Sequence, residues 1–195
     1  WSYQITAVVP VIDTVEELKV CVELLQLQTI QPFIIIVDTG STEANYKEIE
    51  KLRSEDIEVH SIRLNGVLHP SDLPAMAMDL GFSLCRSDYL FATHSDCFLR
   101  RINLLEDMLD SCLNKSPVVG YEITKRMHKD WEGMVSHTCS MYHMKTMDKI
   151  ATCFEAAGNE STESGGSLSM MLLMQQQMSQ QQQKQQFQSM QQLQM

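Results

Sequence analysis

The stretch Phe33-Ile-Ile-Ile-Val-Asp-Thr-Gly-Ser41 has the pattern of a strand that is buried on both faces and ends in a tight turn. Its apolar run stops at Asp38, and the Gly-Ser pair that follows is typical of a turn into a helix. A second run, Val8-Val-Pro-Val-Ile-Asp13, lies upstream and also ends in an aspartate. Two such strands with a helical pattern between them indicate an α/β domain with a parallel sheet.

The rest of the chain extends this alternation. Strands are predicted at residues 3–11, 33–37, 57–62 and 89–93, and helices from Thr14 onward, at 43–53 and at 71–85. Thr14 and Glu17 have the spacing of a capping box. A helix at 104–113 and strands at 118–123 and 137–144 are predicted beyond these. Open parallel sheets bind ligands at the carboxyl ends of their strands, so the segments after Val11, Val37 and Thr93 should carry the chemistry.

The bulk composition limits the class of protein. The chain has 195 residues, of which 44% are hydrophobic and 21% are charged, as expected of a globular domain with a buried core. Its net charge of -10 argues against nucleic acid as a partner, because phosphate backbones require clustered Lys and Arg. No apolar run reaches the ~20 residues of a membrane span. We therefore expect a soluble, cytoplasmic protein.

Two further features concern the cysteines and the end of the chain. The six cysteines include no Cys-x-x-Cys pair, which favours buried reduced thiols over a zinc site. Thirteen of the 21 residues at 175–195 are Gln. This composition cannot supply a packed core, and it predicts a disordered tail or an interaction segment that could mediate oligomerisation. The folded domain is expected to span residues 1–174.

A second group of polar residues follows a predicted strand, in the segment Asp88-Tyr-Leu-Phe-Ala-Thr-His-Ser-Asp-Cys-Phe98. The buried strand is expected to deliver His94 and Asp96, two residues apart, to the same edge of the sheet, where alternation points both side chains the same way. An imidazole and a carboxylate could then bind Mn²⁺ or Mg²⁺. The alternative is a structural link between the two side chains. Asp38 and Ser41 also have two interpretations, as ligands for a nucleotide or as local caps of the turn.

Taken together and in this order, these segments resemble family 2 glycosyltransferases. That family typically has a Val-Val-Pro-x-Tyr-Asn strand, an Asp-Asp-Gly-Ser turn, an Ala-Arg-Asn-x-Gly helix and an Asp-x-Asp segment. The counterparts here are Val8-Val-Pro-Val-Ile-Asp13, Asp38-Thr-Gly-Ser41, Ala77-Met-Asp-Leu-Gly81 and His94-Ser-Asp96. The resemblance implies the GT-A fold, a Rossmann-like open, mostly parallel sheet flanked by helices. It also implies a nucleotide-sugar half over about residues 1–100 and an acceptor half over about 101–174, which could be truncated.

The resemblance implies inverting transfer of a sugar from a nucleoside diphosphate donor to a hydroxyl acceptor on a glycan or a lipid-linked molecule. The positions that would bind the donor are Pro10, Ile12, Asp13, Asp38, Gly40, Ser41, Asp79 and Ser95. Asp96, with His94, would hold Mn²⁺ or Mg²⁺ against the diphosphate. The sequence departs from the family pattern at Thr39, Met78, Asp79 and His94, and each departure removes an expected contact.

The second half of the chain offers three more candidates. Trp131 could stack on an acceptor sugar, or it could anchor a loop. His137 could be a further metal ligand, or a structural residue within its strand. Glu163, in the segment Glu160-Ser-Thr-Glu163, faintly resembles the acidic segment that supplies the family's catalytic base. The alternative for that segment is a solvated acidic linker.

Two other functions compete with transferase activity. One is a degenerate or non-catalytic nucleotide-sugar-binding module with a Gln-rich tail for self-association. The other is a scaffold in which only the tail has a binding function. Binding of nucleotide sugars distinguishes the scaffold from both the transferase and the binding module.

Overall fold

Two central strands, β1 (Ile5–Val11) and β2 (Phe33–Asp38), are buried at every residue. Their continuous apolar runs need neighbours on both faces of the sheet, and helices supply these neighbours. The computed structural model describes residues 2–63, 72–122 and 135–150. All of them lie within one unit of the chain, Trp1–Phe154.

The sheet has six strands in the order β3-β2-β1-β4-β6-β5. The remaining strands are β3 (Ile57–Ser61), β4 (Tyr89–Ala92), β5 (Val118–Glu122) and β6 (Val135–His143). The first four strands in the sheet order are parallel, and β6 runs antiparallel to both of its neighbours. This open, mostly parallel sheet confirms the predicted fold class.

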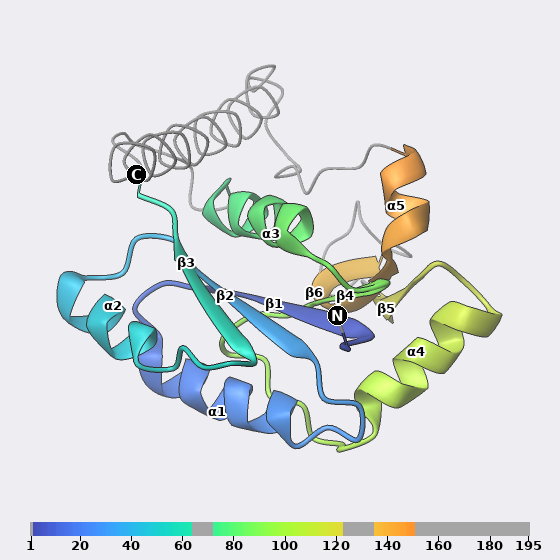
Figure 1. Cartoon of the computed structure of the whole chain (residues 1–195), viewed down its shortest axis with the longest axis horizontal. Helices are drawn as coiled ribbons and strands as arrows, with labels where there is room; N and C mark the ends of the chain where they lie inside the picture. The colour runs from blue at the N-terminus through green and yellow to red at the C-terminus, as the bar shows by residue number, and fades with distance from the viewer. Residues whose placement is uncertain (1, 64–71, 123–134, 151–195) are drawn as a thin grey trace, which may run out of the picture. The chain divides into compact units, whose positions relative to one another are not determined.

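Helices cover both faces of this sheet (Figure 1). The helices α1 (Val15–Gln26), α2 (Glu43–Glu50) and α4 (Leu104–Asn114) lie on one face, and α3 (Asp72–Leu84) lies on the other. A short helix, α5 (Met144–Ile150), follows β6 directly. The main apolar core lies between the sheet and the first group of helices, where Val9, Ile36 and Phe91 meet Leu18 and Leu105.

The start of α1 differs from the prediction. Thr14 is the N-cap residue of α1, but its side chain makes no capping hydrogen bond to the helix. Its Oγ1 instead lies 2.7 Å from the Oγ of Ser95, so the predicted capping box is wrong. The physical reason is tertiary: the end of β4 brings a second hydroxyl close enough to compete for the Thr14 side chain.

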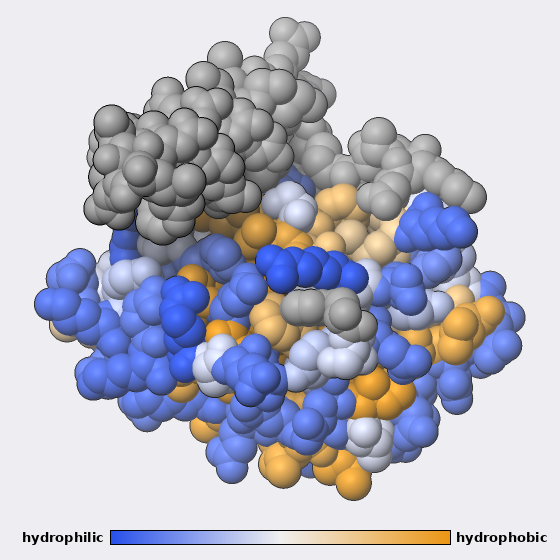
Figure 2. All heavy atoms as spheres, viewed as in Figure 1, coloured by the Kyte–Doolittle hydropathy of each residue, from blue (hydrophilic) through white to orange (hydrophobic). Residues whose placement is uncertain are grey.

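Figure 2 shows one face of the molecule, and apolar residues gather on part of its upper half. Hydrophilic residues cover most of the lower half of that view, with apolar residues between them. The exposed large apolar side chains are Ile12, Val20, Leu27, Phe98, Ile102, Leu113 and Tyr121. Scattered apolar residues of this kind are normal on protein surfaces. Within the described residues, no helix has the length and hydropathy needed to cross a bilayer.

Candidate functional site

The topology of the sheet marks one candidate position for a ligand before any side chain is considered. From β1 the chain continues to β2 and β3 on one side, whereas β4 pairs with β1 on its other side. In open α/β sheets, ligands bind where the strand order reverses in this way, outside the carboxyl ends of the strands. Here that position lies between the segment after β1, which includes Asp13, and the segment after β4, which includes Asp96.

The segment after β4 is a turn, which corrects the basis of the metal-site prediction. β4 ends at Ala92, and the backbone N–H of Cys97 donates to the carbonyl of His94 at 3.0 Å. Strand alternation therefore does not apply to His94 and Asp96. Asp96 is exposed, whereas the Nε2 of His94 is buried. Metal binding by His94 would have to use Nδ1 or a rotated ring.

The segment after β1 is joined to the segment after β2 through Asp13. Its backbone lies in the left-handed region, with φ of 55°, and its N–H donates to the Oγ of Ser41 at 2.8 Å. The Asp13 carboxylate accepts from the backbone N–H of Thr42 at 2.8 Å and from the Nδ2 of Asn45 at 2.9 Å. These hydrogen bonds, the one from Thr42 first, lower the pKa of Asp13. The exposed carboxylate is therefore held in place as an anion.

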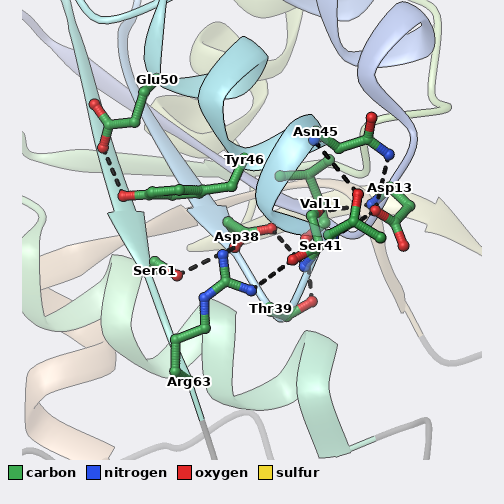
Figure 3. A network of polar contacts seen from close by, with 11 residues as sticks. Val11, Asp13, Asp38, Thr39, Ser41, Asn45, Tyr46, Glu50, Ser61 and Arg63 are labelled. Atoms are coloured by element: carbon green, nitrogen blue, oxygen red, sulfur yellow. Dashed lines mark hydrogen bonds and ion pairs between the residues drawn. The ribbon is translucent and has the colours of Figure 1, made fainter.

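The carboxylate of Asp38 is fully buried and has several partners (Figure 3). One oxygen accepts from the backbone N–H of Ser41 at 3.0 Å. The other accepts from the Oγ of Ser61 at 3.1 Å and pairs with the guanidinium of Arg63 at 2.8 Å. Asp38 thus stabilises its own turn, as the capping interpretation expected, and it also joins β2 to the segment after β3.

Arg63 covers this carboxylate from the solvent side. Its side chain is 45% exposed, whereas the side chain of Asp38 is 0% exposed. A second guanidinium nitrogen donates to the carbonyl of Ser41 at 2.7 Å, and the guanidinium carbon lies 4.9 Å from the ring centroid of Tyr46. A planar guanidinium can make a forked pair and stack at the same time, whereas lysine cannot. Because Arg63 occupies this position, a ligand would reach Asp38 only after Arg63 moves.

The end of β4 is joined to the same edge through Thr14 and Ser95. The contact between their hydroxyls, at 2.7 Å, bridges 81 positions of sequence. Ser95 is buried, and it immediately precedes the exposed Asp96. Hydrogen bonds and one ion pair therefore connect the segments after β1, β2, β3 and β4 at one edge of the sheet.

The structure places the predicted donor-binding residues as follows. Pro10, Asp38, Ser41 and Ser95 are buried, Asp79 is half-buried in α3, and Ile12, Asp13 and Gly40 are exposed. Sequence reasoning did not identify Ser61, Arg63 or Asn45. A cation directly after a predicted strand was the available signal for Arg63. Trp131 and Glu163 lie outside the described residues, and so does the side chain of His137, a residue of β6.

A divalent cation at Asp96 would need further ligands besides this one carboxylate. In the described part of the chain, no three His, Cys, Asp or Glu residues come together as a metal-binding group. A cage made entirely of protein ligands is therefore absent from those residues. Mg²⁺ sites commonly use one or two carboxylates together with substrate phosphates and water, and the exposed carboxylate of Asp96 fits this arrangement.

Three thiols lie close to the turn at residues 94–97, which we call the Asp96 turn. Cys21 and Cys139 are buried, Cys97 is partly buried, and none of the three forms a disulfide. A hydrogen bond from the Cys139 thiol lowers the pKa of Cys97, whereas burial raises the pKa of Cys21 to about 12. Cys85 and Cys112 also form no disulfide, so the cysteines in the described ranges are reduced, as the sequence predicted.

Comparison with known families gives a match over most of the chain. The family model described as "Glycosyl transferase family 2" matches residues 6–160. No curated protein sequence matches the chain. The matched range includes residues 6–11 of β1, the turn at residues 38–41 and the turn at residues 94–97, which are segments that carry the resemblance in the sequence.

Solved structures have the same fold. The mannosyltransferase PcManGT from Pyrobaculum calidifontis, in complex with GDP-Man and Mn²⁺, is 10% identical, with a TM-score of 0.61 over 77% of this chain and 47% of that chain. S. aureus TarS 1–349 is 15% identical, with a TM-score of 0.61 over 81% and 52%. Glucosyl-3-phosphoglycerate synthase from Mycobacterium tuberculosis, with Mn²⁺, UDP-Glc and phosphoglyceric acid, is 10% identical, with a TM-score of 0.53 over 75% and 58%. The chain covers about half the length of these structures.

Proposed function

Since this chain belongs to glycosyl transferase family 2, we propose that it binds a nucleoside diphosphate sugar at the carboxyl edge of its parallel strands. We propose further that it transfers the sugar to a hydroxyl acceptor with inversion. The observation that carries this proposal is the set of contacts joining Asp13 to Ser41, Asp38 to Arg63 and Thr14 to Ser95. They connect four strand ends at the topological switch point of the sheet.

In this proposal the nucleoside lies against the segment after β1 and the Asp38 turn. Pro10, Ile12 and Asp13 would line the base and ribose, and Asp38 would face the base once Arg63 has moved. Gly40 has a φ of 120°, and no atom lies within 4 Å of the position that a Cβ would take. This open backbone would allow close approach of a ligand. Ser41, Asp79 and Ser95 remain predicted contacts of the donor.

The diphosphate would lie beside the Asp96 turn. Asp96 would hold Mn²⁺ or Mg²⁺ together with diphosphate oxygens, and His94 and His137 remain predicted additional ligands. When bound, the cation supplies charge neutralisation for the departing nucleoside diphosphate. The chain's own contribution is to present the Asp96 carboxylate from a closed turn. The backbone hydrogen bond from the N–H of Cys97 to the carbonyl of His94 closes this turn.

The acceptor half remains a proposal for residues 101–174. Trp131 would stack on the acceptor, and Glu163 would take the proton from the attacking hydroxyl. The Gln-rich segment 175–195 is proposed as an oligomerisation tail.

The first test is binding. Titration calorimetry with UDP and GDP sugars should detect binding that is about tenfold stronger with Mn²⁺ than without it, which corresponds to ~1.4 kcal/mol. Asp96→Ala should remove the Mn²⁺ dependence, because the carboxylate that anchors the cation is lost. Asp110→Ala, which removes an exposed carboxylate from α4, is the matched control and should bind as the wild type does. Equal binding with and without Mn²⁺ in the wild type would overturn the metal proposal.

The second test separates enzyme from binding module. A transferase should hydrolyse its donor slowly without acceptor, and Glu163→Gln should lower this rate about 10²-fold or more if Glu163 is the general base. Glu160→Gln removes a carboxylate from the same segment and should leave the rate unchanged. If Glu163→Gln hydrolyses the donor as fast as the wild type, Glu163 is not the base.

One observation favours a second function, a nucleotide-sugar-binding module without turnover. Met78 stands where the family typically has Arg, and its side chain is 1% exposed within the core. That position therefore brings no cation to the diphosphate. For this alternative, the binding test gives a positive result and donor hydrolysis is absent even in the wild type.

A further inference from the structure

Side-chain hydroxyls join the chain at β1 to the chain at β4 near both ends of these strands. Near the amino ends, the Oγ1 of Thr6 lies 2.8 Å from the Oγ of Ser87. Beyond the carboxyl ends, Thr14 and Ser95 make the same kind of contact at 2.7 Å. Each pair bridges 81 positions of sequence. The second pair lies at the edge of the sheet that carries Asp96, and the first lies at the opposite edge.

The hydroxyl of Thr14 is engaged away from the helix that follows it. A threonine at an N-cap position normally accepts a hydrogen bond from a backbone N–H of its own helix, and this bond stabilises the helix. Thr14 makes no such bond, and its hydroxyl contacts Ser95 instead. A residue that departs from its local preference is expected at functional or strained sites. The contact between Thr14 and Ser95 is such a departure.

A second contact joins α1 to the Asp96 turn. The thiol of Cys21 donates to the backbone carbonyl of His94 at 3.6 Å, and the N–H of Cys97 donates to the same carbonyl at 3.0 Å. Cys21 follows Thr14 by about two helical turns, so both contacts come from one side of the helix. The buried apolar side chains of α1 belong to the main core. The turn is therefore attached to a firmly packed element.

The contact between Thr14 and Ser95 also joins the two parts of the proposed donor site. Thr14 directly follows Asp13, whose carboxylate is held by two hydrogen bonds. Ser95 is buried and directly precedes the exposed Asp96. Because consecutive Cα atoms are only about 3.8 Å apart, holding Thr14 against Ser95 limits how far Asp96 can lie from Asp13.

We propose that Thr14 is a positioning residue of the donor site, which acts through Ser95 to fix the place of Asp96 relative to Asp13. Metal-dependent donor binding then depends on a hydroxyl that is not itself a ligand in the proposed site. This effect on binding rests on the proposed function of Asp96. The attachment of the turn to Thr14 does not rest on that function, so it can be tested separately.

The attachment is tested without a ligand, by NMR measurement of hydrogen exchange at the Cys97 amide in the full chain. Thr14→Val removes the hydroxyl and keeps the branched shape of the side chain. We expect the Cys97 amide to exchange about three- to tenfold faster in this variant, the factor that one hydrogen bond contributes. Thr14→Ser retains the hydroxyl and should exchange as the wild type does.

The matched control is Thr6→Val, which removes the hydroxyl contact at the opposite ends of the same two strands. Thr6 is fully buried, so this variant should lower the urea midpoint of unfolding. Exchange at Cys97 should stay unchanged, because the amide of a surface turn exchanges by local opening. Wild-type exchange in Thr14→Val, or equal acceleration in both valine variants, overturns the attachment.

The effect on binding is measured by titration calorimetry with UDP and GDP sugars, with and without Mn²⁺. For the wild type, the proposed function predicts about tenfold stronger binding with Mn²⁺. In Thr14→Val we expect this gain to fall to about threefold or less, while binding without Mn²⁺ stays the same. Thr14→Ser and Thr6→Val should keep the full gain.

The outcomes of this titration separate the positioning role from the proposed function. A full Mn²⁺ gain in Thr14→Val contradicts the positioning role. A loss of binding that is equal with and without Mn²⁺ also contradicts it, because the hydroxyl would then support the whole donor site and not the place of Asp96. If the wild type binds neither UDP nor GDP sugars, the proposed function fails, while exchange at Cys97 still decides whether Thr14 holds the turn.

Discussion

Asp38→Ala should lower the free energy of unfolding by about 2–4 kcal/mol, measured by urea denaturation. The fully buried carboxylate accepts hydrogen bonds from Ser41 and Ser61 and pairs with Arg63. Alanine would leave buried donors without an acceptor, each at a cost of about 1–3 kcal/mol, and would remove the anion that pairs with the Arg63 guanidinium. The turn that positions Ser41 against Asp13 should loosen as a result.

Two control variants separate the turn from the ion pair. Arg63→Ala should cost only about 1 kcal/mol, because Arg63 is at the surface and water can solvate the newly exposed carboxylate. Asp38→Asn keeps an acceptor for the Ser41 N–H and should fall between the two. If Arg63→Ala were as destabilising as Asp38→Ala, the ion pair and not the buried turn would be the main source of stability.

Gly81→Ala should destabilise the protein by about 2 kcal/mol or more, although alanine is normally the better helix former by ~1 kcal/mol. A Cβ at position 81 would lie 2.3 Å from the Cγ1 and 2.6 Å from the Cγ2 of Val8. Gly81 therefore sets how closely α3 approaches β1. Overpacking of a tight core typically costs about 1–3 kcal/mol, and the overlap with both methyl groups places this substitution in the upper part of that range.

A double-mutant cycle identifies the contact responsible. Val8→Ala removes both methyl groups that would meet the new Cβ, so it should be less harmful in the Gly81→Ala background than in the wild type. We expect a coupling energy of about 1 kcal/mol or more from urea denaturation of the four proteins. Additive effects would show that α3 shifts as a unit and that the Val8 contact does not limit its position.

The strands and helices could be predicted from local sequence patterns. The predicted strand at 33–37 differs from β2 only by the inclusion of Asp38, and the predicted helix at 104–113 differs from α4 by one residue. Both signals are carried by neighbouring residues: continuous β-branched runs require burial on both faces, and a 3.6-residue period requires one buried helical face. The ordered motifs added the family, which the match over residues 6–160 supports.

The detailed geometry of the candidate site depended on contacts between distant residues. The Thr14 hydroxyl was expected to cap its own helix, but the end of β4 offers it Ser95, 81 positions away. His94 and Asp96 were expected on a continuing strand, but the chain turns after Ala92. Arg63 had no visible partner in the sequence, because Asp38 lies in another strand and the two meet only through the pairing of β2 with β3.

Apolar periodicity and turn residues along the chain were therefore sufficient for the alternating elements, the sheet class and the strand ends that hold Asp13, Asp38 and Asp96. Strand order and register decided which of these groups are buried, which are exposed and which hydroxyl or guanidinium each one meets. The physical reason is the distance along the sequence between the residues that interact. Burial patterns are repeated in adjacent residues, whereas a hydrogen bond forms only when folding brings two particular atoms to about 3 Å.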